Sequence, residues 1–489
     1  MDGPTHYDPT TTAGAGPPRP PAELPRTFGD LRASGWTSVT VAEEMRRNTA
    51  ALIASGGSLV PGVLGFEETV VPQLENAILA GHDIILLGER GQAKSRIIRS
   101  LVGLLDEWLP VVAGSEINDD PDHPVSRMAI DLVDEQGDET PINWVHRSQR
   151  YGEKLATPDT SIADLIGEVD PIKIAEGRYL SDELALHYGL IPRVNRGIFA
   201  INELPDLSER IQVGLLNVLE ERDVQIRGHR IRLPLDLMLV ATANPEDYTN
   251  RGRIITPLKD RFGAQIRTHY PEETMTEVKI MVSEAELPQR GVPVTVPDYL
   301  KEVVAEVSQL ARRSTHLNQR SGVSVRLSIS NYETLVANSV RRALRTGEPA
   351  AVPRISDLSS LVSSTQGKIE VEAMEEGHED EVVAHLVAAA TLAVFRRRVT
   401  LDDPGAIVAA FGEQVVVHAG DDLPSASYLA VLADIPELEP PTRALAGPDA
   451  AESPALMASA LEFLLEGLHL TKRLNKDASG ARALYRGRK

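Results

Sequence analysis

Residues 83–101, DIILLGERGQAKSRIIRSL, decide the fold, because they predict a strand, a loop and a helix in direct succession. An apolar run precedes the loop, and apolar residues recur at helical spacing after it. The loop matches G-x-x-x-x-[G]-K-[ST] with alanine in place of the second glycine, and it consists of Gly88, Glu89, Arg90, Gly91, Gln92, Ala93, Lys94 and Ser95. This context favours a phosphate-binding loop over a plain strand–turn–helix connection.

Each part of this loop has a chemical role in holding phosphates. Its backbone N–H groups can point inward at phosphate oxygens, and the following helix presents its positive N-terminus. Lys94 can reach the β- and γ-phosphates, and the hydroxyl of Ser95 can ligate Mg²⁺. Ala93 departs from the pattern, because alanine costs about 1 kcal/mol if the position requires a positive φ and almost nothing if φ is helical. The sequence leaves both possibilities open.

A second group of polar residues follows two predicted strands. The strand at 198–201 ends in Asn202 and Glu203, and the strand at 237–243 ends at Asn244. Glu203 can polarise an attacking water as a general base, whereas Asn202 can accept a hydrogen bond from a Mg²⁺-bound water but brings no charge. We therefore expect Asn202→Asp to lower the Mg²⁺ requirement. Arg261 and Arg326 complete the set. Taken alone, Glu203 could be an N-terminal helix charge, and each arginine could be a solvated surface charge.

The composition excludes several other kinds of protein. The 489 residues hold 50 Lys and Arg against 71 Asp and Glu, a net charge of −21 that argues against sequence-independent nucleic-acid binding. The absence of cysteine excludes disulfides, thiolate zinc sites, iron–sulfur clusters and cysteine nucleophiles. The longest apolar runs are far shorter than the ~20 residues of a membrane helix, and the N-terminus does not resemble a signal peptide. We expect a cytoplasmic protein without a membrane partner.

Patterning predicts six segments along the chain. Residues 1–26 are expected to be a disordered tail, 27–60 an N-terminal helical segment with a helix near 41–54, and 61–275 an α/β domain. Helical patterns dominate 276–350 and 351–433, and 434–489 reads as a linker, an amphipathic helix at 454–475 and a basic tail. Within the α/β domain we expect strands at 83–87, 111–113, 142–145, 198–201, 237–243 and 264–267. The clearest helices there are 95–109, ended by Pro110, and 207–221, with the capping-box pair Asp206 and Glu209.

With these residues in order, residues 60–345 resemble the AAA+ ATPases, and more closely the clade of the magnesium chelatase I subunit and the MoxR proteins. The resemblance implies an α/β fold, a AAA+ P-loop core with a five-stranded parallel sheet, followed by a helical lid (276–350) and a helical C-terminal extension. It implies the following roles: Walker A for Lys94 and Ser95, Walker B for Asn202 and Glu203, sensor 1 for Asn244, arginine finger for Arg261, sensor 2 for Arg326, and contact near adenine for Val63 and Leu64. The alternating stretch 224–233 fits a β-hairpin of this clade, either a moving contact surface or a structural hairpin.

The resemblance also implies ATP and Mg²⁺ as cofactors, ATP hydrolysis, and a ring, often a hexamer, in which Arg261 completes the neighbouring subunit's site. The function it implies is a motor that remodels or activates a partner protein with a von Willebrand factor A domain, or assists metal or cofactor insertion. The acidic stretch 370–381 is then a docking face or a solvated helix.

Three alternatives stay open beside the motor. Magnesium insertion into a porphyrin is disfavoured by the extension beyond about residue 355. A transcriptional activator of the enhancer-binding type is disfavoured because the GAFTGA loop is absent. A nucleotide-binding scaffold with weak or no hydrolysis is suggested by Ala93 and Asn202. It is opposed by the retained polar set, which consists of Lys94, Ser95, Glu203, Asn244, Arg261 and Arg326.

Overall fold

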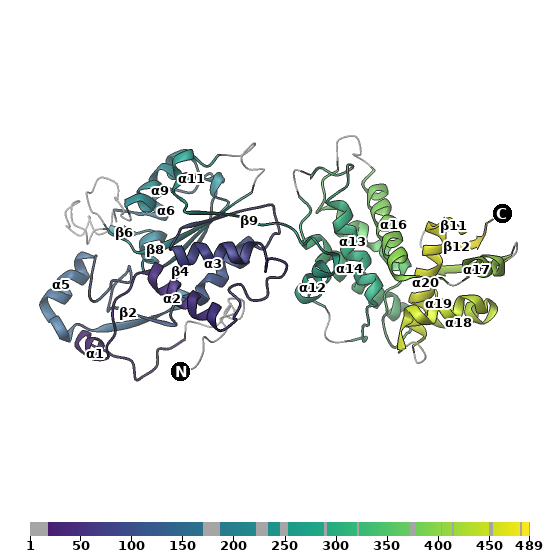
Figure 1. Ribbon diagram of the computed structural model, residues 1–489, viewed down its shortest axis with the longest axis horizontal. Helices are drawn as coiled ribbons and strands as arrows, with labels where there is room; N and C mark the ends of the chain where they lie inside the picture. The colour runs from purple at the N-terminus through teal and green to yellow at the C-terminus, as the bar shows by residue number, and fades with distance from the viewer. Residues whose placement is uncertain are drawn as a thin grey trace. The chain divides into compact units, whose positions relative to one another are not determined.

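The computed structural model describes residues 18–169, 186–221, 233–244, 253–287, 291–319, 322–371, 378–401, 403–412, 415–448, 453–479 and 482–488 (Figure 1). The chain divides into two compact units, Met1–His269 and Tyr270–Lys489. Most of the expected N-terminal tail, the hairpin at 224–233 apart from its last residue, and residues 372–377 of the acidic stretch lie outside the described residues.

A five-stranded parallel sheet forms the centre of the first unit, as predicted. Its strands run in the order β4-β7-β8-β1-β9, and every neighbouring pair is parallel. The bounds are β1 Ile84–Leu87, β4 Tyr151–Leu155, β7 Gly197–Asn202, β8 Leu237–Ala243 and β9 Ala264–Arg267. β7 and β8 are buried along their whole length, so both faces of the sheet must be covered.

Alternate residues of the strands fill two apolar clusters, one on each face of the sheet. Ile84 and Leu86 of β1 join helices α2 (Val41–Ala54), α3 (Val70–Ala80) and α4 (Lys94–Ser100) on one face. Ile85 joins the cluster of the opposite face, which includes helix α9 (Glu209–Glu221). This alternation follows from the two-residue period of a strand. The predicted helix near 41–54 is therefore present and forms part of the sheet's cover (Figure 1).

Shorter elements complete the first unit. They are helices α1 (Phe28–Ala33), α5 (Arg127–Gln136), α6 (Ile162–Leu165), α8 (Leu190–Arg193) and α11 (Thr256–Arg261), and the antiparallel pairs β2 (Trp108–Val112) with β3 (Ile142–His146) and β5 (Gly167–Val169) with β6 (Leu186–Tyr188).

The first unit differs from the sequence prediction in three places. The helix expected at 95–109 ends at Ser100, passes through a 3₁₀ turn at Leu101–Leu104 and gives way to β2. Pro110 lies within that strand, where its carbonyl accepts a hydrogen bond from Arg196 Nη1 at 2.8 Å. The expected strands at 111–113 and 142–145 pair with each other rather than joining the parallel sheet, whose edge is β4. Helix α9 begins at Glu209, so Asp206 lies in the preceding 3₁₀ turn and not at the predicted cap.

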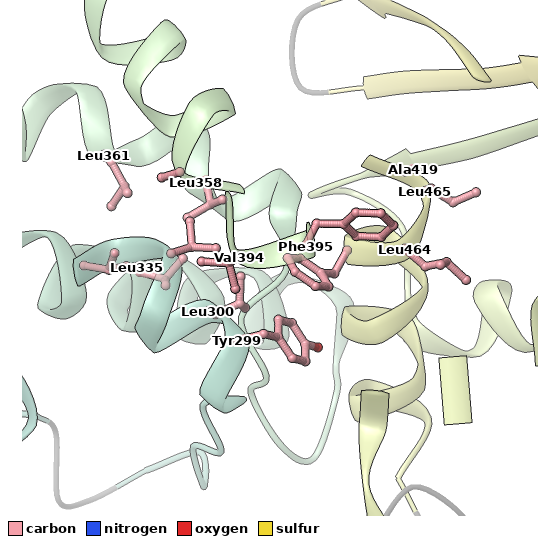
Figure 2. Close-up of a cluster of buried hydrophobic side chains, with 14 of the residues drawn as sticks. Tyr299, Leu300, Leu335, Leu358, Leu361, Val394, Phe395, Ala419, Leu464 and Leu465 are labelled. Carbon is pink, nitrogen blue, oxygen red and sulfur yellow. The ribbon is translucent and has the colours of Figure 1, made fainter. Parts of the chain in front are cut away.

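Helices dominate the second unit, as predicted. They are α12 (Thr274–Glu284), α13 (Asp298–Ala311), α14 (Arg326–Thr346), α15 (Leu361–Gln366), α16 (Glu379–Arg398), α17 (Pro404–Phe411), α18 (Ser425–Asp434), α19 (Glu439–Ala446) and α20 (Pro454–Leu470). Their inner faces share one apolar core, shown in Figure 2. Within it the rings of Tyr299 and Phe463 stack with centroids 4.5 Å apart, so α13 and α20 are in direct contact.

The C-terminal part of this unit contains more regular secondary structure than the sequence predicted. The stretch expected to be a linker contains α19, and α20 is buried on nearly all sides rather than amphipathic. The expected basic tail forms strand β12 (Arg482–Gly487) of a small antiparallel sheet with β10 (Val416–Gly420) and β11 (Leu474–Ser479). Tyr485 anchors β12 because its ring is buried and its hydroxyl donates to Glu466 Oε2 at 2.5 Å.

Across the residues that the structure describes, none of the helices combines the length and apolar character needed to cross a bilayer.

Candidate functional site

The phosphate loop connects β1 to α4, as predicted, and its backbone requires small residues. A Cβ at Gly88 would lie 1.9 Å from Thr268 Oγ1 and 2.2 Å from Gln92 Oε1, so any larger residue would displace these two side chains. Gly91 has a φ of 75°, in the left-handed region that glycine adopts without strain. The loop is therefore held against the end of β9 by a close approach of backbone to side chain.

Ala93 resolves the question that the sequence left open. Its φ is 54° and its ψ is 13°, so an alanine occupies a left-handed position directly before α4. The chain keeps the backbone course that a glycine would give, at a strain of about 1 kcal/mol.

Lys94 is buried and connects the loop to β8. Its Nζ donates to the carbonyl oxygens of Gly88 at 2.5 Å and Glu89 at 2.8 Å, and to Asn244 Oδ1 at 2.7 Å. Asn244 is the residue that follows β8, so its amide reaches the loop across the carboxyl edge of the sheet. The predicted Walker A lysine and sensor 1 asparagine are thus in direct contact.

Glu203 joins the same group. The amide nitrogen of Asn244 donates to Glu203 Oε2 at 2.7 Å, and the backbone N–H of Glu203 donates to Thr242 Oγ1 at 3.0 Å. Glu203 has a φ of 55°, an uncommon conformation for a residue with a side chain and one that is frequent at functional sites. Lys94, Asn244 and Glu203 therefore form a continuous line across the ends of β1, β8 and β7.

Asn202 has a neighbour that the sequence did not indicate. Its Nδ2 donates to Glu153 Oε1 of β4 at 2.5 Å, and its Oδ1 accepts from Thr242 Oγ1 at 3.3 Å. Glu153 also accepts hydrogen bonds at 2.9 Å from Arg99 Nε and from the hydroxyl of Tyr151. Burial acts to raise the pKa of Glu153, but the hydrogen bonds from Arg99 and Tyr151 outweigh it, so the pKa lies below its usual value.

A cavity of about 310 Å³ adjoins the loop on the side of β9. It is lined by Leu87, Gly88, Glu89, Gln92, Lys259, Arg267 and Thr268. Val63, expected near adenine, packs against the apolar cluster of α2, α3 and α4, and its contact with adenine stays a prediction, as does that of Leu64.

The two predicted arginines lie on helices α11 and α14. Arg261 ends α11, is half exposed, and its Nη2 forms an ion pair with Glu220 Oε1 of α9 at 2.5 Å. Arg326 is the first residue of α14 and belongs to the second unit. Ser95 is exposed in the first turn of α4.

The donor set at the ends of the strands fits Mg²⁺. Hydroxyl, amide and carboxylate oxygens from Ser95, Asn202 and Glu203 are hard ligands of the kind that Mg²⁺ prefers. Within the described ranges, no three His, Cys, Asp or Glu side chains are grouped so as to hold a metal ion by themselves. These residues therefore fit an ion whose remaining ligands are phosphate oxygens and water.

Comparison with known proteins points to the same family. Residues 145–262 match the family model described as AAA domain (dynein-related subfamily). The chain is 29% identical over 281 residues to the magnesium-chelatase subunit ChlI of Nostoc sp., covering 54% of this chain and 68% of that protein. It is 27% identical over 246 residues to the magnesium-chelatase 38 kDa subunit of Rhodobacter capsulatus, covering 47% and 62%.

A solved assembly of the magnesium chelatase subunits BchI and BchD also matches, with a TM-score of 0.35 and 21% identity over 65% of this chain and 97% of that one. The chain therefore carries a segment that matches an AAA domain and is similar to magnesium chelatase I subunits, which supports the predicted resemblance to AAA+ ATPases of the magnesium chelatase I type.

Proposed function

We propose that the chain binds ATP with Mg²⁺ at residues 88–95 and hydrolyses it. The observation that carries the proposal is the amide of Asn244, which bonds both Lys94 and Glu203. Lys94 neutralises phosphate charge, Glu203 accepts the proton of the attacking water, and Asn244 keeps the two in register. Mg²⁺, when bound, neutralises charge on the β- and γ-phosphates.

The alternative, a scaffold with little hydrolysis, rests on the two departures from the motif. The backbone of Ala93 already has the positive φ of a glycine-containing loop, so that departure leaves the loop's course intact. The contacts from Lys94 through Asn244 to Glu203 orient the carboxylate that acts as the base, and a scaffold without hydrolysis would not require this orientation. Hydrolysis is therefore the better-supported function.

Separating binding from turnover tests this proposal. Glu203→Gln keeps the oxygen that accepts from Asn244 but removes the base, so a fluorescent ATP analogue should bind normally while phosphate release stops. Lys94→Ala should lose binding itself. Equal loss of ATP binding in both variants would refute the role of Glu203, and measurable binding without turnover in the unmodified protein would favour the scaffold.

We further propose that the subunits form a ring, with a hexamer as the expected size, in which Arg261 acts on the neighbour's nucleotide. This role requires Arg261 to leave Glu220, and the cost is small because exposed ion pairs contribute about 0–1 kcal/mol. Arg261→Ala should bind ATP and hydrolyse it poorly. Mixing it with Glu203→Gln protein should restore activity at interfaces that combine an intact Glu203 with a neighbour's intact Arg261. If subunits exchange and no mixing ratio restores turnover, the role in trans is wrong.

The remaining proposals concern domains, partner and location. We propose that residues 61–275 form the nucleotide-binding domain and 276–350 the lid that carries Arg326 as sensor 2. The relatives are named as magnesium-chelatase subunits. On that basis we propose a cytoplasmic motor that remodels or activates a protein with a von Willebrand factor A domain, or assists metal insertion. A purified partner of this kind should change the rate of ATP turnover, whereas Glu203→Gln protein should show no turnover with or without it.

A further inference from the structure

Glu153 of β4 lies beside the Walker B position and is held by donors from three elements. Asn202 of β7 donates to its Oε1 at 2.5 Å, while Arg99 of α4 and Tyr151 of β4 donate to its Oε2 at 2.9 Å. The register explains this contact. Leu155 pairs with Asn202, and Glu153 lies two residues earlier on the same face of β4.

The chemistry of this contact fixes the orientation of the Asn202 amide. An ionised carboxylate can only accept hydrogen bonds, so the NH₂ group of Asn202 must face Glu153. The carbonyl oxygen must then face the other way, where it accepts from Thr242 Oγ1 at 3.3 Å. Asn202 thus offers an acceptor oxygen at the end of β7, as an aspartate would, while the negative charge is on the adjacent strand.

We propose that Glu153 supplies the negative charge that position 202 lacks and orients Asn202 toward the Mg²⁺–nucleotide complex. Glu153 is a positioning residue that acts through Asn202, and the inference rests on the proposed binding of ATP with Mg²⁺. Mutation of residues that orient a metal's ligands typically changes metal affinity by about 10- to 100-fold. Glu153→Gln should therefore raise the Mg²⁺ concentration needed for half-maximal nucleotide binding by roughly that factor.

The same contact reverses a simple expectation from the sequence. Asn202→Asp would place a second carboxylate against Glu153 at the present 2.5 Å separation, where like charges repel. This single variant should therefore need more Mg²⁺, not less. The double variant Glu153→Gln/Asn202→Asp exchanges the amide and the carboxylate, restores one charge and one hydrogen bond, and should return to within about threefold of the unmodified protein.

The experiment is a double-mutant cycle on the full-length protein. A fluorescent ATP analogue is titrated into the unmodified chain, the two single variants and the double variant, over a range of Mg²⁺ and also in EDTA. Thermal unfolding without nucleotide is recorded for each protein. Glu135→Gln, on the exposed side of α5, is the matched carboxylate-to-amide control. It should leave unchanged the Mg²⁺ midpoint, which is the Mg²⁺ concentration at half-maximal nucleotide binding.

A purely structural role is tested by Tyr151→Phe, which removes one hydrogen bond to Glu153 without changing any charge. It should leave the Mg²⁺ midpoint within about threefold of the unmodified protein. A shift as large as that of Glu153→Gln would overturn the proposal, because loosening the cluster would then suffice.

Other results would also overturn it. These are an unchanged midpoint in Glu153→Gln, a lower midpoint in Asn202→Asp, or a double variant worse than both single variants. Failure of the proposed function looks different, because the unmodified protein would then not bind the analogue, or Lys94→Ala would bind it equally well. Mg²⁺-dependent binding with an additive cycle would refute only the role of Glu153.

Discussion

Replacing Lys94 by alanine should destabilise the first unit even when no nucleotide is added. The ammonium is buried and donates to three acceptors: the carbonyls of Gly88 and Glu89 and the side chain of Asn244. The variant leaves these acceptors without their donor and removes the side-chain link between the phosphate loop and Asn244, although the backbone hydrogen bond from Gly88 to Ala243 of β8 remains. We therefore expect a loss of stability as well as a loss of ATP binding.

The size of the effect follows from the contacts. A hydrogen bond that involves a charged group contributes about 1.5–3 kcal/mol, but three contacts of one ammonium are not additive, and burying the charge offsets part of the gain. We therefore expect Lys94→Ala to lower the free energy of unfolding by about 2–4 kcal/mol through the loss of all three contacts. In a domain of this size each kcal/mol shifts Tm by about 2–4 °C, so Tm should fall by roughly 4–16 °C.

Thermal unfolding followed by circular dichroism, without nucleotide or Mg²⁺, measures this effect. Arg210→Ala, on the exposed face of α9, is the matched control and should change Tm by no more than about 2 °C. An unchanged Tm in Lys94→Ala would refute the reasoning, because the ammonium would then contribute nothing through its three acceptors. Binding assays on Lys94→Ala should therefore be run well below its own Tm.

Four further substitutions have predicted outcomes. Ala93→Gly should raise Tm slightly, because glycine avoids a left-handed penalty of about 1 kcal/mol but loses about 0.4–1 kcal/mol through the greater entropy of the unfolded chain. Gly91→Ala should lower Tm, and equal shifts of the same sign in the two variants would contradict the backbone argument. Arg150→Met should reduce the free energy of unfolding in urea by about 3–5 kcal/mol, because it leaves the buried carboxylate of Glu44 without its charged partner. A reduction below about 1 kcal/mol would show that this ion pair is not buried. Burial raises the pKa of Glu462, so the contribution of its carboxyl group to stability is present below the ordinary carboxyl pKa and is lost as pH rises through the raised pKa. The Tm of Glu462→Gln should therefore fall less between about pH 5 and pH 8 than the Tm of the unmodified protein, and parallel curves of Tm against pH would contradict the raised pKa.

Much of the candidate site could be predicted because each of its parts is marked by a short, continuous stretch of sequence. The loop is flanked by an apolar strand and a helix, and Glu203 and Asn244 each follow a fully buried apolar strand. In a parallel sheet the carboxyl ends of neighbouring strands share one edge, so these residues had to lie near one another.

Glu153 could not be found in this way. Its strand, YGEKL, is short and partly polar, because it lies at the edge of the sheet, and its partner Asn202 is 49 residues away. The helix predicted at 95–109 was wrong for a related reason: apolar residues at helical spacing also suit a turn followed by a strand when tertiary packing decides. At the C-terminus, the two arginines of β12 made the segment read as a basic tail, although the side chain of Tyr485 between them is buried.

The strand order of the sheet has a consequence for co-translational folding. β1, which carries the phosphate loop, lies between β8 and β9, and Asp83 at its start bonds Leu239 of β8, 156 residues later in the chain. Contacts so distant in sequence form slowly, because a long loop must close before they contribute. The emerging chain must therefore hold an apolar strand and a glycine-rich loop without their neighbours until β8 and β9 have been synthesised. Rare codons or chaperone contacts between β1 and β8 would act on the interval in which the phosphate loop has no sheet to hold it.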